Sequence, residues 1–167
     1  MIHYFCPFCW VEISKNQKTC RQCGRDTGEW NDKSYTEKLL YSLSHFEPST
    51  VYRARYILGE RREQLAVQPL IDLLKKTMDP FLMEVIIDAL SKIGDQRIVP
   101  LLIDMLKNSS FLVRGKAASV LCNFGSQEEV KAALKEATND HSNYVRNAAK
   151  VSLAKLTKGL DRDRANG

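Results

Sequence analysis

Residues 66–74 read AVQPLIDLL and residues 98–106 read IVPLLIDML, so nearly the same text returns 32 positions later. In both copies the apolar residues recur at the i, i+3, i+4, i+7 spacing of one helix face. Leucines in a second element repeat at a similar distance: Leu58, Leu90, Leu121 and Leu153. A period kept by two elements predicts a stack of helix pairs, because each pair needs neighbours to cover its apolar face.

Four such helix pairs are predicted between Thr36 and Leu156. Their ranges are 36–46 with 50–62, 65–77 with 80–93, 96–107 with 111–124, and 127–138 with 142–156. Pro48 and Pro80 stand in or beside turns, where the missing N–H of a proline does little harm. The expected fold is therefore all-α, a right-handed solenoid of about four pairs, above the minimum of about three repeats that such a stack needs.

The text of the second helices distinguishes between repeat families of similar period. Two of these helices carry Val-Arg, then two small residues and a leucine, at Val113-Arg114 with Ala117, Ala118 and Leu121, and at Val145-Arg146 with Ala148, Ala149 and Leu153. The motifs of ankyrin and tetratricopeptide repeats are absent. The segment therefore resembles the HEAT repeat, particularly the short bacterial type related to phycobilisome-lyase repeats. This resemblance implies that successive second helices form a concave surface for a protein or peptide.

Four of the five cysteines form two C-x-x-C pairs near the N-terminus: Cys6, Cys9, Cys20 and Cys23. Two such turns can supply four thiolates in the tetrahedron that structural zinc accepts, and that closed site leaves no open position for catalysis. A redox C-x-x-C normally precedes a helix in a βαβ unit, a context that is missing here. We therefore predict one structural zinc held by these four residues, although iron could occupy the same sulfurs in a foreign host.

The cysteine segment also resembles the small zinc-ribbon modules with the pattern C-P-x-C-G, a short hairpin, then C-x-x-C-G. Matching positions are Cys6, Pro7, Cys9, Cys20, Cys23 and Gly24, whereas Trp10 stands where the family usually has Gly. We expect residues 11–13 to form a strand and the ribbon to cap the first helix pair. The aromatic residues Phe5, Phe8, Trp10 and Trp30 would dock it onto Leu39 and Leu40.

Composition limits the other possibilities. The net charge of +5 and the content of 27% charged residues are ordinary for a soluble domain, and no apolar stretch approaches the ~20 residues of a membrane span. The first residues lack the features of a signal peptide, so we expect a cytoplasmic protein with no membrane partner. The expected domains are a zinc ribbon over 1–34, helical repeats over 35–157 and a flexible tail over 158–167.

Eight charged residues are candidates for binding a partner on the second helices: Arg53, Arg55, Glu84, Asp88, Arg114, Lys116, Arg146 and Lys150. For Arg114 and Arg146 the alternative is a hydrogen-bond ladder between repeats, with Asp140 in the turn before Arg146. Cys122 is expected to be a buried small hydrophobe. Since no phosphate loop, nucleophile elbow, triad or His-Glu pair is visible, we expect no catalytic residue, no enzyme activity and no small-molecule substrate.

Three functions remain open. We favour a protein–protein scaffold or adaptor that uses the concave surface of the repeats. A nucleic-acid binder would use the basic residues of the ribbon and first repeat, namely Lys15, Lys18, Arg21, Arg25, Arg53, Arg55, Arg61 and Arg62. Interspersed acids, Glu84 and Asp88 on the inner face, and the lack of an aromatic series in the repeats argue for weak binding at most. A bilin-lyase-like or accessory enzyme subunit is suggested by family kinship alone.

Overall fold

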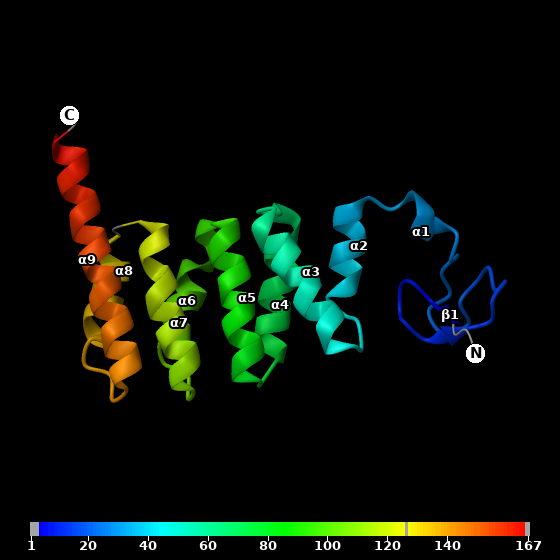
Figure 1. The fold of residues 1–167 in the computed structure, drawn as a ribbon, viewed down its shortest axis with the longest axis horizontal. Coiled ribbons are helices and arrows are strands. Elements are labelled where there is room, and N and C mark those ends of the chain that lie inside the picture. The colour runs from blue at the N-terminus through cyan, green and yellow to red at the C-terminus, as the bar shows by residue number, and fades with distance from the viewer. Residues whose placement is uncertain (1–3, 126, 166–167) are drawn as a thin grey trace.

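The helix pairs stand side by side in one row, with a small N-terminal sheet at one end of it (Figure 1). The fold is that of a computed structural model, which describes residues 4–125 and 127–165. The first helices of the four pairs are α2 (Tyr35–Ser42), α4 (Val67–Lys76), α6 (Val99–Met105) and α8 (Glu128–Ala137). The second helices are α3 (Pro48–Glu60), α5 (Pro80–Ile93), α7 (Phe111–Leu121) and α9 (Asn143–Ala165).

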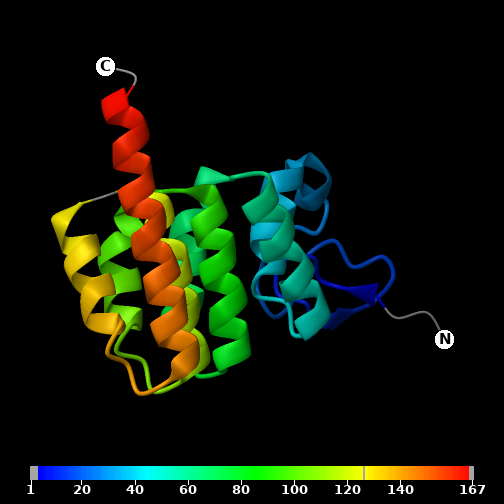
Figure 2. The same cartoon turned by 60° about the vertical axis from the view of Figure 1, so that its left-hand side comes forward.

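The four predicted helix pairs are confirmed, with small differences at their ends. Short 3-10 turns at Gln64–Ala66 and Gln96–Ile98 lead into α4 and α6, and a third follows α7 at Cys122–Phe124. The α9 backbone continues to Ala165, well past the predicted end at 156, and it projects beyond the other helices (Figure 2). Residues 166–167 of the predicted tail lie outside the described residues, and the domain boundaries stay predictions.

Local chemistry sets where several helices begin and end. Ser34 and Glu37 form a reciprocal capping box at the start of α2. At the start of α5, the Asp79 carboxylate accepts a hydrogen bond of 3.0 Å from the Phe81 backbone N–H, and Pro80 occupies the first turn. Gly94 ends α5 with a φ of +79°, a conformation that is cheap only for glycine.

One apolar core runs through all four pairs. Leu58, Leu90 and Leu121, which share the sequence period, are completely buried, whereas Leu153 in the last pair is half-buried. The last helix has no following repeat to cover it, which accounts for this difference. Cys122 is half-buried rather than fully buried, and it packs against the edge of the same core.

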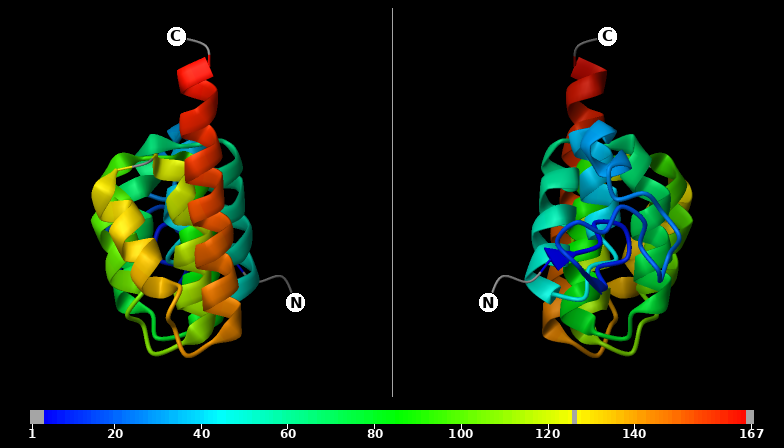
Figure 3. Two further views of the ribbon diagram at one scale, coloured as in Figure 1. Left: turned by 90° about the vertical axis from the view of Figure 1, so that its left-hand side faces the viewer. Right: turned by 90° about the vertical axis from the view of Figure 1, so that its right-hand side faces the viewer.

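The second helices form the closely packed layer of the stack. A Cβ added to Gly59 of α3 would lie 2.9 Å from the Ala89 Cα of α5, so these two backbones nearly touch. Ser152 of α9 donates a hydrogen bond of 2.7 Å to the Ala118 carbonyl of α7. Neighbouring first helices make far fewer contacts, so they splay apart and the second helices form the inner layer. Figure 3 shows the two layers on opposite sides.

Candidate metal centre and partner surface

The N-terminal module consists of two similar cysteine turns. Strands β1 (Tyr4–Phe5) and β2 (Glu12–Ile13) pair antiparallel, so the predicted strand at 11–13 is confirmed over its last two residues. In the first turn the Trp10 N–H donates to the Cys6 carbonyl at 2.9 Å. In the second turn the Gly24 N–H donates to the Cys20 carbonyl at 2.8 Å. The two turns therefore present their sulfurs in the same way.

Trp10 takes the backbone conformation that the ribbon pattern assigns to glycine. Its φ is +62°, close to the +72° of Gly24, and a side chain in this region costs about 1–2 kcal/mol. The Trp10 ring offsets part of that cost by packing on His45, with ring centres 4.3 Å apart. The residue that departs from the ribbon pattern therefore keeps the turn and adds a contact to the repeats.

The four cysteine sulfurs form a cluster that fits a tetrahedral metal ion. All four Sγ atoms lie within 4.8 Å of one another, with 3.7 Å between Cys6 and Cys23 and 3.6 Å between Cys9 and Cys20. A zinc ion with bonds of about 2.3 Å places its sulfurs about 3.8 Å apart. The donor set and its spacing therefore match a closed four-thiolate site.

The surroundings of these thiols oppose full ionisation without a cation. Burial raises the pKa of Cys9 to about 12 and also raises the pKa of Cys6. The Cys23 backbone N–H, which donates to the sulfur of Cys20, is the main cause that lowers the pKa of Cys20 to about 7. A bound cation would stabilise all four thiolates, so metal binding at this site releases protons.

Aromatic side chains dock the ribbon onto α2 and onto the turn that follows it. Phe8 packs edge-on against Trp30 of α1 (Glu29–Asp32) and against Tyr41 of α2, at ring distances of 5.6 and 5.3 Å. Arg25 donates a hydrogen bond of 2.8 Å to the Tyr41 hydroxyl. Phe5 lies 6.0 Å from Phe46. The predicted docking through aromatic residues is thus correct in kind.

The expected docking site on α2 was wrong in its residues. Leu39 and Leu40 belong to the core of the repeats, whereas Tyr41 belongs to the apolar cluster of the ribbon. The reason is helical spacing. Leu39 and Leu43 are four residues apart and share the face toward α3, while Tyr41 between them points elsewhere. The ribbon therefore covers the outer side of α2, the end of the stack that has no preceding repeat.

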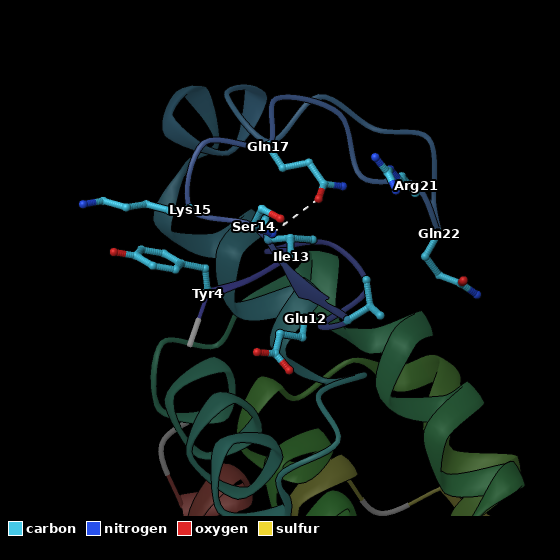
Figure 4. A pocket seen from close by; sticks show the side chains of 9 residues that line it. Tyr4, Glu12, Ile13, Ser14, Lys15, Gln17, Arg21 and Gln22 are labelled. Atoms are coloured by element: carbon cyan, nitrogen blue, oxygen red, sulfur yellow. Dashed lines mark hydrogen bonds between the residues drawn. The ribbon is translucent and has the colours of Figure 1, made fainter. Parts of the chain in front are cut away.

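The basic residues of the ribbon do not converge on one face. Lys15 and Arg21 border an open hollow together with Tyr4 and Gln22. Figure 4 shows Lys15 extending to one side of this hollow and Arg21 lying on the opposite side. Arg25 is engaged by Tyr41. The ribbon therefore offers no single basic patch from these residues.

Arg114 and Arg146 hold the turns between helices. The Arg114 guanidinium pairs with Asp140 of the next repeat at 2.7 Å, and it also donates to the carbonyls of Asn108 and Ser109. Arg146 donates in the same manner to the carbonyls that lie 32 residues further on, those of Asp140 and His141. The Arg114–Asp140 pair is an inter-repeat contact of the kind that was the alternative to ligand contact, whereas the other bonds hold each arginine to the turn before its own helix.

Asp88 and Lys116 are also occupied by contacts between repeats. The Asp88 carboxylate pairs with Lys116 of α7 at 2.5 Å and with Lys92 at 3.0 Å, and Lys92 pairs with Glu60 of α3 at 2.6 Å. These four residues form a charge ladder across α3, α5 and α7. Opposite charges alternate along it, so the middle of the inner layer carries little net charge.

The remaining candidates divide by exposure. Arg53 and Lys150 are exposed, and Glu84 is half-buried. Arg55 is only 1% exposed, even though it lies on the same helix as Arg53. Its guanidinium carbon lies 3.5 Å from the centre of the Tyr52 ring. The eight candidates therefore do not form one continuous charged surface.

Sequence reasoning missed a row of exposed aromatic residues. Each lies within two residues of the start of a second helix, with exposures of 66%, 64%, 49% and 47%: Phe46, Phe81, Phe111 and Tyr144. All second helices begin at the same edge of the stack, the lower edge in Figure 1. The repeats therefore do carry exposed aromatic residues, whereas the expectation that they lack a series able to stack successive bases stays a prediction. A signal was present, because an aromatic residue lies within two positions of Pro48, Pro80, Ser110 and Asn143.

No helix within the described residues is long and apolar enough to cross a membrane.

Comparison with known proteins agrees with this architecture. The family described as HEAT repeats matches residues 36–111 and again 78–154, which together span most of the chain. Among solved structures, the complex of CpcE and CpcF of phycocyanin lyase from Nostoc sp. PCC7120 is similar. Its TM-score is 0.53 at 20% identity, over 87% of this chain and 71% of that chain. At this identity the likeness concerns the fold alone. A search of curated proteins found no match.

Proposed function

Since the chain belongs to the HEAT-repeat family, we propose that it is a non-catalytic protein-interaction module, a scaffold or adaptor. Its partner would be a protein or peptide that binds along the aromatic row and the adjoining inner layer of second helices. The zinc ribbon serves as a structural cap at the first repeat. We expect this module to act in the cytoplasm.

The aromatic row is the observation that carries this proposal. Four large rings are exposed along one edge, each near the start of a second helix. Exposed apolar rows mark interaction sites, and aromatic residues provide many of the residues that dominate binding energy. Glu60, Asp88, Lys92 and Lys116 of the inner layer are paired with one another, so these charges contribute less to binding a partner than free charges would. The rings are therefore the best available anchors for a partner.

The ion in the four-cysteine cluster would be zinc with a structural role. Cys6, Cys9, Cys20 and Cys23 would hold it, and when bound it would supply folding free energy to the ribbon. The ribbon has a small apolar cluster of its own around Cys6, Phe8 and Cys20. A module of this size needs such a cross-link to stay folded.

The similar solved structure supports a protein partner in a general way. It is a complex of two chains, CpcE and CpcF. An inner layer of the same fold in this chain would be suited to hold another polypeptide. The likeness carries no argument for lyase activity here, because activity depends on a site rather than on a fold.

Nucleic acid is the second candidate because aromatic side chains can stack on unpaired bases. Fluorescence anisotropy with labelled DNA and RNA at ~150 mM salt tests it, since weak electrostatic binding fades there. We expect a Kd no tighter than about 10⁻⁶ M. A Kd of about 10⁻⁸ M, lost on reversal of Arg53, Arg61 and Arg62 to Glu, would contradict the proposal. Reversal of Lys75, Lys76 and Lys135, exposed on the first helices, is the matched control.

A further inference from the structure

Arg55 carries a buried positive charge that the nearby Tyr52 and Asp79 offset only in part. The side chain is 1% exposed, and neither terminal guanidinium nitrogen has a hydrogen-bond partner within the part of the chain that the structure describes. A buried guanidinium that lacks hydrogen bonds to its terminal nitrogens destabilises the fold, and contact with the face of the Tyr52 ring offsets only part of that cost. Burial lowers the pKa of Arg55, and nearby Tyr52 and Asp79 oppose that shift.

The sequence position of Arg55 does not require a charged residue. The residues at the same place in the next two repeats are Ile87 and Ala118, which are completely buried in the core. An apolar residue at position 55 would therefore fit the repeat better. The presence of arginine there indicates a role other than packing.

Arg55 borders a cavity of about 280 Å³ between the α2–α3 turn and the second repeat. The other lining residues are mostly apolar, among them Leu43, Phe46, Val51 and Leu82. Among the described residues, none of those that line it is acidic. Its volume is at the lower limit for a drug-sized ligand, so it suits a single large side chain.

We propose that this cavity binds the C-terminal residue of a partner protein, with its carboxylate on Arg55 and its apolar side chain against Leu43, Val51 and Leu82. A carboxylate matches the planar fork of arginine and cancels the buried charge once the guanidinium, whose terminal nitrogens are buried, turns toward the cavity. A chain end brings an apolar group and a carboxylate on one carbon atom. An internal Asp or Glu would bring two flanking peptide groups into an apolar cavity that cannot satisfy them.

The cavity lies between the aromatic row and the contact of the ribbon with the repeats. Phe46 forms one wall and is the first ring of the aromatic row, so a chain along that row can end in this cavity. His45 forms another wall and packs on Trp10 of the ribbon. The proposal depends on the proposed function only for the source of the carboxylate, a protein chain end.

NMR titration of the full-length protein with short peptides tests the site directly. The probes are N-acetyl-Gly-Gly-Leu and N-acetyl-Gly-Gly-Phe, each as the free acid and as the C-terminal amide. We expect the acids to shift the Arg55 Nε–H signal with a Kd of about 1 mM or tighter. The amides should bind at least about tenfold more weakly, the factor that one charge-assisted hydrogen bond supplies.

The Arg55→Met variant should not bind the peptide acids, and its melting temperature should be at or above that of wild type. The control is Arg97→Met, which replaces an exposed arginine and should bind the acids as wild type does. If Arg55→Met does not fold, Arg55→Lys decides, because it keeps the charge but loses the fork and should bind several-fold more weakly. Equal binding of acids and amides, no shift with either acid, or binding kept without Arg55 would overturn the proposal. Acetate binding as tightly as the peptides would overturn the chain-end assignment. These outcomes are independent of the nucleic-acid assay above.

Discussion

Single residues that break the repeat pattern are the informative ones in this chain. Trp10 occupies a glycine position and Arg55 an apolar one, and in each case the departure creates a feature: a contact between ribbon and repeats, and a charged cavity wall. The burial of Arg55 could have been read from the 32-residue period that aligns it with Ile87. The lack of hydrogen-bond partners for its two terminal nitrogens could not have been predicted from the sequence, because it depends on where neighbouring side chains point.

Gly59→Ala tests the close approach of the second helices. Its new methyl group would lie 2.9 Å from the backbone of Ala89, so α3 and α5 must separate. We expect the free energy of unfolding, measured by urea denaturation, to fall by about 1–2 kcal/mol. The cost of overpacking is larger than the gain in helix propensity from Gly to Ala, which is about 0.5–1 kcal/mol. Gly115→Ala is the control. Its methyl group would meet a side chain rather than backbone, lying 2.2 Å from the half-exposed ring of Tyr144, so relief requires only that this ring moves. A Gly59→Ala protein as stable as wild type would refute this packing.

At the level of elements, periodicity predicted the four helix pairs, and Pro48 and Pro80 marked the turns where α3 and α5 begin. The short 3-10 turns before α4 and α6 were missed, because Ala66-Val67 and Ile98-Val99 continue the apolar pattern without a visible break. The cluster of four cysteines was predicted from spacing alone, since two C-x-x-C turns fix the geometry locally. The exposed edge of aromatic residues was missed, because exposure is decided by how neighbouring pairs stack.

Asp140→Asn tests the ladder between the last two repeats. The Arg114 guanidinium holds the pKa of Asp140 below its usual range, so stability from this pair is present above about pH 4 and is lost as the carboxylate is protonated at lower pH. We expect the variant to lose about 1–2 kcal/mol of unfolding free energy at pH 7. The difference from wild type should shrink toward pH 3. As a control, Asp104→Asn at an exposed position of α6 should change the free energy of unfolding by less than about 0.5 kcal/mol. Equal losses at both pH values would contradict this account.

Metal removal tests the ribbon as a separate element. Elemental analysis should find about one zinc per chain. Both tryptophans, Trp10 and Trp30, pack beside the ribbon, so tryptophan fluorescence reports the ribbon while far-UV circular dichroism reports the repeats. A strong chelator should change the fluorescence and leave most of the helical signal. A natively folded ribbon without metal would disprove the metal assignment, and loss of the whole helical signal would show that the repeats depend on the ribbon.

In the whole molecule, the surfaces available to a partner are set by the ribbon at one end of the stack and by the edge where the second helices begin. The ribbon covers the outer side of α2 through Tyr41 and His45, which leaves the second helices uncovered on the inner side. Because each pair is antiparallel, all second helices start at one edge and bring Phe46, Phe81, Phe111 and Tyr144 into a row. Rings that are far apart in sequence thus form a surface only through the repeat.

The most direct test of partner binding through this row compares capture from extracts of cells that express the protein. Immobilised wild type, a Phe81→Ser, Phe111→Ser, Tyr144→Ser variant, and a Tyr35→Ser, Leu65→Ser control are quantified side by side by mass spectrometry. The control residues are also exposed and large, but they lie away from the row. Tyr35 is the first residue of α2, and Leu65 lies in the 3-10 turn that precedes α4. We predict proteins enriched by wild type and control and reduced at least about tenfold by the row variant. Equal enrichment by all three would contradict the account.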